Sequence, residues 1–249
     1  MKETADVLET QETKISYRTP IYLQLREIVR NKIEDGEYLP GTAIPSENEL
    51  ADTYGIHRIT VRNAVDALVN EGMLRRVQGK GVFVVGNKME QAIEEFSGFV
   101  PSIAKNTEQM SVKEQTKVLR PAGDKFANMF RIEPSDLIYY IRRVLFVDAE
   151  PVSVEEVYLP RAVIPQLDVV NSSVFSLNDV FAFYGVDVSK VRQNLEIVEC
   201  GVKIRRALEV PDGVAVMMLE CAYDDVGGSV IEYSRMYTRS DKCSFKVSM

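Results

Sequence analysis

The segment from Pro45 to Val84 restricts the fold of this chain more than any other stretch. Ser46 and Glu49 have the three-residue spacing of a capping box, in which each side chain satisfies a backbone amide that a helix start leaves unpaired. Gly55 comes where a helix ends in a left-handed residue, and a new helix is predicted from Arg58. The segment therefore predicts two short helices joined by a tight turn, a helix-turn-helix.

The second of these helices combines an apolar stripe with a polar N-terminal end. The stripe follows the i, i+3, i+4, i+7, i+8 spacing of an amphipathic helix and consists of Val61, Ala64, Val65, Leu68 and Val69. Four polar residues lie off the stripe, at the end where a recognition helix meets base edges and phosphates: Arg58, Thr60, Arg62 and Asn63. Taken alone, the pattern fits an ordinary helix with a solvated face equally well.

A basic hairpin predicted at residues 74–84 decides between these interpretations. Gly79 and Gly81 flank Lys80, which suits a tip whose backbone adopts positive φ. From Ile56 to Lys88, six basic side chains stand against two acidic ones, although the whole chain has a net charge of −7. A local positive charge in an acidic chain indicates a polyanionic partner at this place only. Helices and hairpin together predict a winged helix-turn-helix that binds DNA.

At these residues the sequence resembles a known family. The run "PSENELADTYGIHRITVRNAVDALVNEGMLRRVQGKGVFVV" is similar to the GntR family of bacterial transcription regulators. His57, Asn48 and Val82 depart from the family's usual serine, arginine and threonine. The resemblance implies that Ser46 and Glu47 lie near the phosphates. It implies that Arg58, Thr60 and Arg62 face the groove. It also implies that the wing is formed by Arg75, Gln78, Lys80 and Gly81.

After residue 96 the pattern changes to strands with few helices, which predicts an α+β chain. Strands are predicted at 116–119, 137–147, 152–159, 191–198, 214–223 and 230–238, and helices at 124–130 and 174–184. The predicted division is a flexible tail at 1–17, the winged helix at 18–86, a linker at 87–96 and a sheet domain at 97–249. A weak internal repeat aligns Glu155 with Glu232 at an offset of 77 residues, and coincidence explains it equally well.

The C-terminal part has a resemblance of its own. The runs "YYIRRVLFVDAEPVSVEEVYLP" and "VIEYSRMYTRSDKCSF" resemble the UTRA domain, a ligand-sensing module of one GntR subfamily. That resemblance implies a chorismate-lyase-like fold, an antiparallel sheet with flanking helices. It implies effector contacts from Arg143, Glu155 and Ser173, and a loop around Ser102 that closes over the ligand. Glu232 and Thr238 share a strand face by the period of two and complete the predicted site.

The partner of Arg143 depends on the loop that joins two predicted strands. A two-residue turn at Ala149 and Glu150 would place Arg143 opposite Glu156, whereas a three-residue loop would place it opposite Glu155. The resemblance favours Glu155, and a simple cross-strand ion pair is the alternative to a ligand site. Because a guanidinium binds phosphates and carboxylates, we expect a small anionic effector, a sugar phosphate first. Leu145 replaces a second arginine that many relatives have.

Together these features predict a bacterial DNA-binding transcription regulator, a repressor that acts as a homodimer on a palindromic operator. The alternative is a chorismate-lyase-like enzyme fused to a DNA-binding domain. The single histidine, His57, lies in the DNA-binding part, and catalytic motifs are missing from the sequence, so we predict no enzyme activity. Three scattered cysteines, a polar N-terminus and the lack of a long apolar run predict a cytoplasmic protein without metal, cofactor or membrane partner.

Overall fold

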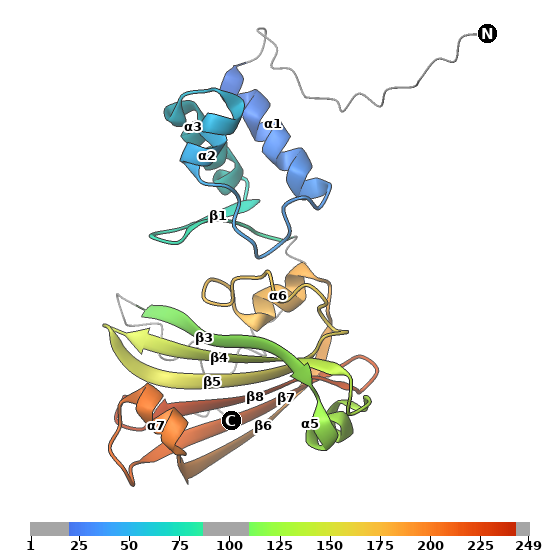
Figure 1. The fold of residues 1–249 in the computed structure, drawn as a ribbon, viewed down its shortest axis with the longest axis vertical. Coiled ribbons are helices and arrows are strands. Elements are labelled where there is room, and N and C mark those ends of the chain that lie inside the picture. The colour runs from blue at the N-terminus through green and yellow to red at the C-terminus, as the bar shows by residue number, and fades with distance from the viewer. Residues whose placement is uncertain (1–19, 87–109, 243–249) are drawn as a thin grey trace, which may run out of the picture. The chain divides into compact units, whose positions relative to one another are not determined.

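The computed structural model describes residues 20–86 and 110–242, and the chain divides into two compact units, residues 1–85 and 86–249. The two units are coloured along the chain in Figure 1. The tail predicted at 1–17, the linker predicted at 87–96 and the candidate Ser102 lie outside the described residues. None of the helices in the described ranges is long and apolar enough to cross a membrane.

The N-terminal unit is a winged helix-turn-helix, as the sequence predicts. Three helices are followed by a two-stranded antiparallel hairpin: α1 (Ile21–Glu34), α2 (Glu47–Tyr54), α3 (Arg58–Asn70), β1 (Leu74–Val77) and β2 (Gly81–Val84). The predicted capping box is confirmed, because the Ser46 amide donates to Glu49 Oε2 at 2.7 Å and the Glu49 amide donates to Ser46 Oγ at 3.3 Å. Gly55 ends α2 at φ 63°.

One hydrophobic core holds this unit together. The apolar stripe of α3 packs against α1, α2 and the hairpin through buried side chains: Leu25, Val29, Ile44, Leu50, Val61, Ala64, Val65, Leu68, Leu74 and Val84. Val69, predicted on the stripe, lies at its partly buried edge. Because the stripe occupies one side of α3, the opposite side, which carries Arg58 and Arg62, remains exposed to solvent.

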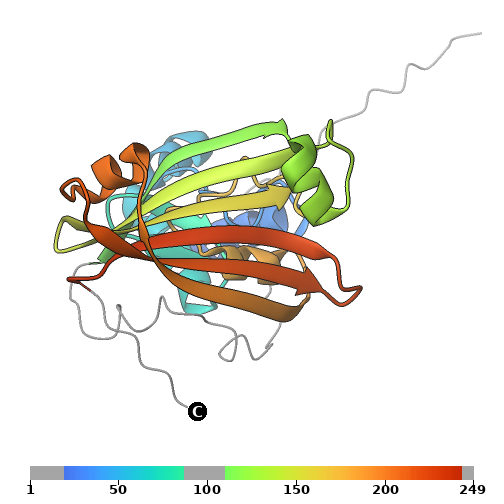
Figure 2. The same ribbon diagram turned by 90° about the horizontal axis from the view of Figure 1, so that it is seen from below.

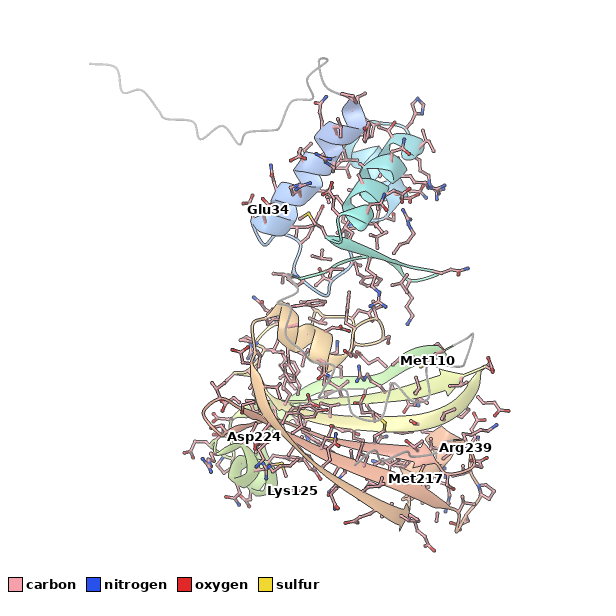
Figure 3. All side chains as sticks on the ribbon, turned by 180° about the vertical axis from the view of Figure 1, so that it is seen from behind. Glu34, Met110, Lys125, Met217, Asp224 and Arg239 are labelled. Atoms are coloured by element: carbon pink, nitrogen blue, oxygen red, sulfur yellow. The ribbon has the colours of Figure 1, made fainter. Side chains whose placement is uncertain are left out.

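The C-terminal unit is a six-stranded antiparallel sheet with the strand order β3-β4-β5-β8-β7-β6. Its elements are β3 (Met110–Pro121), α5 (Gly123–Phe130), β4 (Leu137–Val147), β5 (Glu150–Pro160), α6 (Leu177–Phe183), β6 (Val188–Glu199), α7 (Val202–Leu208), β7 (Ala215–Asp225) and β8 (Val230–Arg239). Met110 and Arg239, labelled in Figure 3, mark the start of β3 and the end of β8. The predicted α+β class is confirmed.

Several predicted boundaries were wrong. The strand predicted at 116–119 is the twelve-residue β3, and the helix predicted at 174–184 is limited to α6 by a cap at Ser176. The sequence prediction missed α7, whose seven residues are too few to show a helical period. It is stabilised by packing, since Ile204 and Leu208 are buried against the sheet.

The element order supports the internal repeat. A strand, a helix and two strands occur twice, first as β3-α5-β4-β5 and then as β6-α7-β7-β8. β3 begins at Met110 and β6 at Val188, 78 residues later, and β4 and β7 begin at Leu137 and Ala215, again 78 residues apart. The two copies meet where β5 pairs with β8 in the middle of the sheet.

The two faces of the sheet have different coverings. α5 and α7 lie near opposite ends of the strands (Figure 2), and their apolar side chains pack on the face that includes Ile138, Val144 and Val154. Successive residues of a strand point to opposite faces, so Arg143 and Glu155 point to the other face. On that face, the loop before α6 approaches β4, because the Tyr139 hydroxyl donates to the Pro165 carbonyl at 2.9 Å.

Candidate DNA interface and effector site

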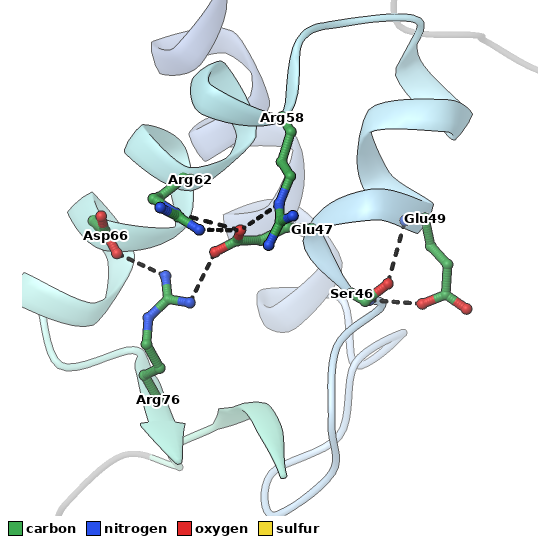
Figure 4. Close-up of polar contacts among 7 residues, drawn as sticks. All are labelled: Ser46, Glu47, Glu49, Arg58, Arg62, Asp66 and Arg76. Carbon is green, nitrogen blue, oxygen red and sulfur yellow. Dashed lines mark hydrogen bonds and ion pairs between the residues drawn. The ribbon is translucent and has the colours of Figure 1, made fainter. Parts of the chain in front are cut away.

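In the N-terminal unit, one carboxylate joins three arginines (Figure 4). Arg58 Nε and Arg62 Nη2 each lie 3.2 Å from Glu47 Oε2, and Arg76 Nη1 lies 2.8 Å from Glu47 Oε1. Arg76 Nη2 also pairs with Asp66 of α3 at 2.7 Å. Because α2, α3 and β1 each contribute to this group, the ion pairs connect both helices of the helix-turn-helix to the wing.

The cluster has a buried centre and an open rim. The side chain of Glu47 is 9% exposed, whereas those of Arg58, Arg62 and Arg76 are 59%, 48% and 40% exposed. Partial burial raises the pKa of Glu47, but hydrogen bonds from Arg76, Arg62 and Arg58 outweigh it and lower the pKa to about 2. Glu47 is therefore ionised at neutral pH, and an excess of positive charge faces solvent around it.

The predicted DNA-binding residues largely occupy this exposed region. Seven side chains and a wing glycine are exposed: Ser46, Arg58, Arg62, Asn63, Arg75, Gln78, Lys80 and Gly81. Thr60 is half-buried and Glu47 is buried. The sequence prediction did not include Arg76 among the DNA-binding residues. Because side chains alternate along β1, Arg75 and Arg76 point to opposite faces of the hairpin, and Arg76 is the one that pairs with Glu47.

The C-terminal candidates begin with a cross-strand pair between β4 and β5. Arg143 is aligned with Glu155, and Arg143 Nε donates to Glu155 Oε2 at 2.7 Å. The expected partner is therefore present, but neither of the predicted loops produces it. Asp148 and Ala149 form the turn, with φ of 50° and 65°, and a bulge in β5 shifts the register afterwards.

Arg143 is also attached to the loop before α6. Its Nη1 donates to the carbonyl oxygens of Ser172 at 3.0 Å and Phe175 at 3.3 Å, and its side chain is 11% exposed. In the same loop, Ser173 Oγ accepts from the backbone amide of Glu114 at 3.0 Å. Glu114 is the residue of β3 that pairs with Arg143, so Ser173 lies beside this pair.

Glu232 is the most deeply buried acid of the group. The residue is 3% exposed, and its Oε2 has no hydrogen-bond partner among the described residues. Burial, followed by the charge of Glu155, raises the pKa of Glu232 to about 8, against the opposing effects of Arg143 and of a hydrogen bond from Ser234. Arg143, Glu155 and Glu232 therefore form one electrostatically coupled group on the sheet.

Thr238 lies in the pairing between β5 and β8. Its Oγ1 is 2.9 Å from Ser153 Oγ, and the two residues are 2% and 1% exposed. This hydrogen bond connects the two copies of the repeated unit at one end of their shared ladder. Of the six predicted effector residues, the structure places Arg143, Glu155 and Glu232 in one group, with Ser173 beside them and Thr238 in the β5–β8 pairing. Ser102 is not described.

Two family profiles match the chain. The profile for bacterial regulatory proteins of the gntR family matches residues 21–84, and the UTRA domain profile matches residues 109–244. The HTH-type transcriptional repressor NagR of Bacillus subtilis is 28% identical over 233 residues, which cover 91% of this chain and 93% of the relative. The mannosyl-D-glycerate transport/metabolism system repressor MngR of Escherichia coli is 26% identical over 228 residues, which cover 91% and 94%.

A solved structure has a similar fold. PhnF from Mycobacterium smegmatis superposes with a TM-score of 0.54 at 19% sequence identity, and the match covers 92% of this chain and 98% of that chain. The match includes both the helical N-terminal part and the antiparallel sheet.

Proposed function

This chain belongs to the GntR family of bacterial regulatory proteins with a UTRA domain, and we propose that it is a repressor whose operator binding is controlled by a small molecule in the C-terminal unit. It is a transcription regulator and not an enzyme. The observation that carries the DNA-binding role is the arginine-rich face of α3 and β1, which is exposed around one buried carboxylate. Repression is the function named for NagR and MngR.

We assign base reading to the N-terminal end of α3 and phosphate contacts to the wing. Arg58 and Arg62 are one helical turn apart, so both reach the same side of α3. Arginine binds the two acceptors of guanine bidentately in the major groove. Arg75, Gln78 and Lys80 are exposed on the hairpin, where a phosphate backbone is the matching partner. A homodimer would supply two such units to a palindromic operator in the cytoplasm.

We place the effector on the sheet face that carries Arg143, Glu155, Ser173 and Glu232, with Thr238 at its border. A guanidinium recognises phosphate or carboxylate, and carboxylates accept hydrogen bonds from sugar hydroxyls. The relative MngR is named for mannosyl-D-glycerate transport and metabolism, which supports a sugar-derived effector. A sugar phosphate is our first candidate. We retain the predicted division into a tail at 1–17, a DNA-binding domain at 18–86, a linker at 87–96 and an effector-binding domain at 97–249 as part of this proposal.

The experiment uses the full-length chain and DNA that it selects from a random pool. We expect enrichment of an inverted repeat, tight binding of that enriched duplex, and release of DNA in the presence of one member of a sugar-phosphate set. By linkage, DNA and effector must change each other's affinity by the same factor, usually about 5–150-fold. Arg143→Ala should remove the effector's influence while operator affinity stays near that of the parent. Selection that recovers no common sequence would refute the DNA-binding proposal.

A further inference from the structure

We propose that Glu47 is a positioning residue that sets DNA specificity by holding Arg58, Arg62 and Arg76 in one arrangement, without contacting DNA itself. This inference rests on the proposed DNA-binding function and assigns a role within that interface. The unusual feature is the sign of the charge, because a carboxylate at a DNA-binding face repels phosphates.

The contacts of Glu47 direct both of its oxygens towards arginines. Oε2 pairs with Arg58 and Arg62, and Oε1 pairs with Arg76. A carboxylate can read a cytosine amino group, but only if an oxygen reaches the groove. With 9% of its side chain exposed and three guanidinium groups around it, Glu47 is screened from a duplex by the arginines themselves.

The position of Glu47 makes it a rigid anchor. It is the first residue of α2 and directly follows the N-cap Ser46, whose capping box orders the backbone at this point. The positive end of the helix dipole also favours a carboxylate there. On α3, Arg58 and Arg62 point towards it from adjacent turns, and Arg76 reaches it from the wing.

Two effects on DNA binding follow, and they have opposite signs. Holding the arginines in place before DNA arrives reduces the side-chain entropy that a specific complex must lose, so it favours the correct sequence. The negative charge lowers the local positive charge by one, so it weakens contacts to phosphates of any sequence. Both effects raise the ratio of specific to nonspecific affinity. Loss of a purely structural residue would instead weaken binding of both kinds of DNA.

The test compares Glu47→Gln with Glu49→Gln in the full-length chain. Glu49 is on the same helix and is exposed, and glutamine can replace glutamate in a capping box, so the control removes an equal charge without touching the arginines. The probes are the duplex that the parent enriches from a random pool and a scrambled duplex of equal composition. Binding is measured by fluorescence anisotropy over a range of salt concentrations.

We expect Glu47→Gln to bind the scrambled duplex about two- to eightfold more tightly near 0.1 M salt, with a salt slope steeper by up to about 0.9. We expect the ratio of the two affinities to fall by about tenfold, since guanidinium contacts to bases lose their alignment. Glu49→Gln should keep the ratio within about twofold of the parent value. The charge-preserving variant Glu47→Asp, which is too short to hold all three arginines, should lose specificity without the gain in nonspecific binding.

Equal changes in Glu47→Gln and Glu49→Gln would show a general charge effect and overturn the proposal. Weaker binding of both duplexes by Glu47→Gln would show loss of the interface and would overturn it too. Circular dichroism melting of each variant identifies unfolding, and Glu47→Asp then decides the outcome. If the parent itself fails to distinguish the two duplexes, the proposed DNA-binding function fails; if the parent distinguishes them and Glu47→Gln does so equally, only this inference fails.

Discussion

Arg143 faces Glu155 because β5 contains one more residue than β4 next to the turn. Phe146 pairs with Pro151 and Leu145 with Ser153, so Val152 is the extra residue of a bulge. If the same sequence paired from the turn without a bulge, Val154 would lie opposite Arg143, whereas in the structure Val154 pairs with Val144. Because strand side chains alternate between faces, the bulge is what puts the guanidinium and the carboxylate on the same side of the sheet.

This relationship predicts a large cost for removing one member of the pair. Arg143→Leu should destabilise the C-terminal unit by about 3 kcal/mol, because it leaves Glu155 largely buried without its cation and next to Glu232. The double variant Arg143→Leu/Glu155→Leu should recover much of that loss. Urea unfolding followed by circular dichroism measures both. The control is Lys242→Ala, which removes the exposed ion pair between Lys242 and Glu150. Equal unfolding midpoints for parent and Arg143→Leu would contradict the prediction.

Glu232 predicts a pH dependence of stability with a definite sign. Its folded pKa of about 8 lies above the ordinary value of 4.5, so the folded state keeps a proton that the unfolded chain releases between these pH values. Stability should therefore fall as pH rises from 4.5 to 8, by at most about 4 kcal/mol from this group. In Glu232→Gln this decline should be absent. Thermal midpoints from pH 5 to 8.5 test it, with the exposed Glu199→Gln as control; parallel profiles for parent and Glu232→Gln would exclude the mechanism.

The hydrogen bond between Ser153 and Thr238 predicts non-additive substitutions. Thr238→Val should cost about 1–3 kcal/mol, because Ser153 is 1% exposed and its hydroxyl would lose the partner that the structure shows. Replacing both residues, as Ser153→Ala/Thr238→Val, should be milder than the single change. A double-mutant cycle of urea unfolding free energies measures the coupling. A double variant as unstable as the sum of the singles would mean that the bond contributes nothing.

At the DNA interface, helix and wing residues should differ in kind. Arg62→Ala should weaken binding of the enriched duplex by about 1–3 kcal/mol and relax the preference at one base position. Lys80→Ala should weaken enriched and scrambled duplexes alike and reduce the salt slope by about 0.9. Salt titrations of both, with Arg26→Ala on α1 as control, distinguish these outcomes. Titrations of Arg62→Ala and Lys80→Ala that match the parent would show that the helix and wing are misassigned.

The parts of the fold that sequence predicts well are those determined by near neighbours. The capping box spans Ser46 to Glu49, and the stripe of α3 repeats every three or four residues, so both are visible in a short window. The basic hairpin is equally local. The family resemblance then supplied the partner of Arg143, which turn geometry had left open between two glutamates.

The parts that sequence reasoning missed depend on distant residues. Glu47 was assigned to phosphates because its position in the motif was visible, whereas its three partners lie 11, 15 and 29 residues away. The bulge in β5 has no marker such as glycine at Val152, and it lies where successive residues of the strand are buried on both faces. Burial of Glu232 likewise follows from the sheet order, in which β8 lies between β5 and β7.

The duplicated architecture leaves a seam in the middle of the sheet. β5 and β8 share six aligned positions, from Ser153–Thr238 to Tyr158–Tyr233, whereas β3 and β4 share eleven. Glu155 and Glu232 lie on opposite sides of this seam, one in each copy of the unit. A ligand that bound the carboxyl groups of both residues would connect the two halves of the sheet, and part of its binding energy would then oppose separation of β5 from β8.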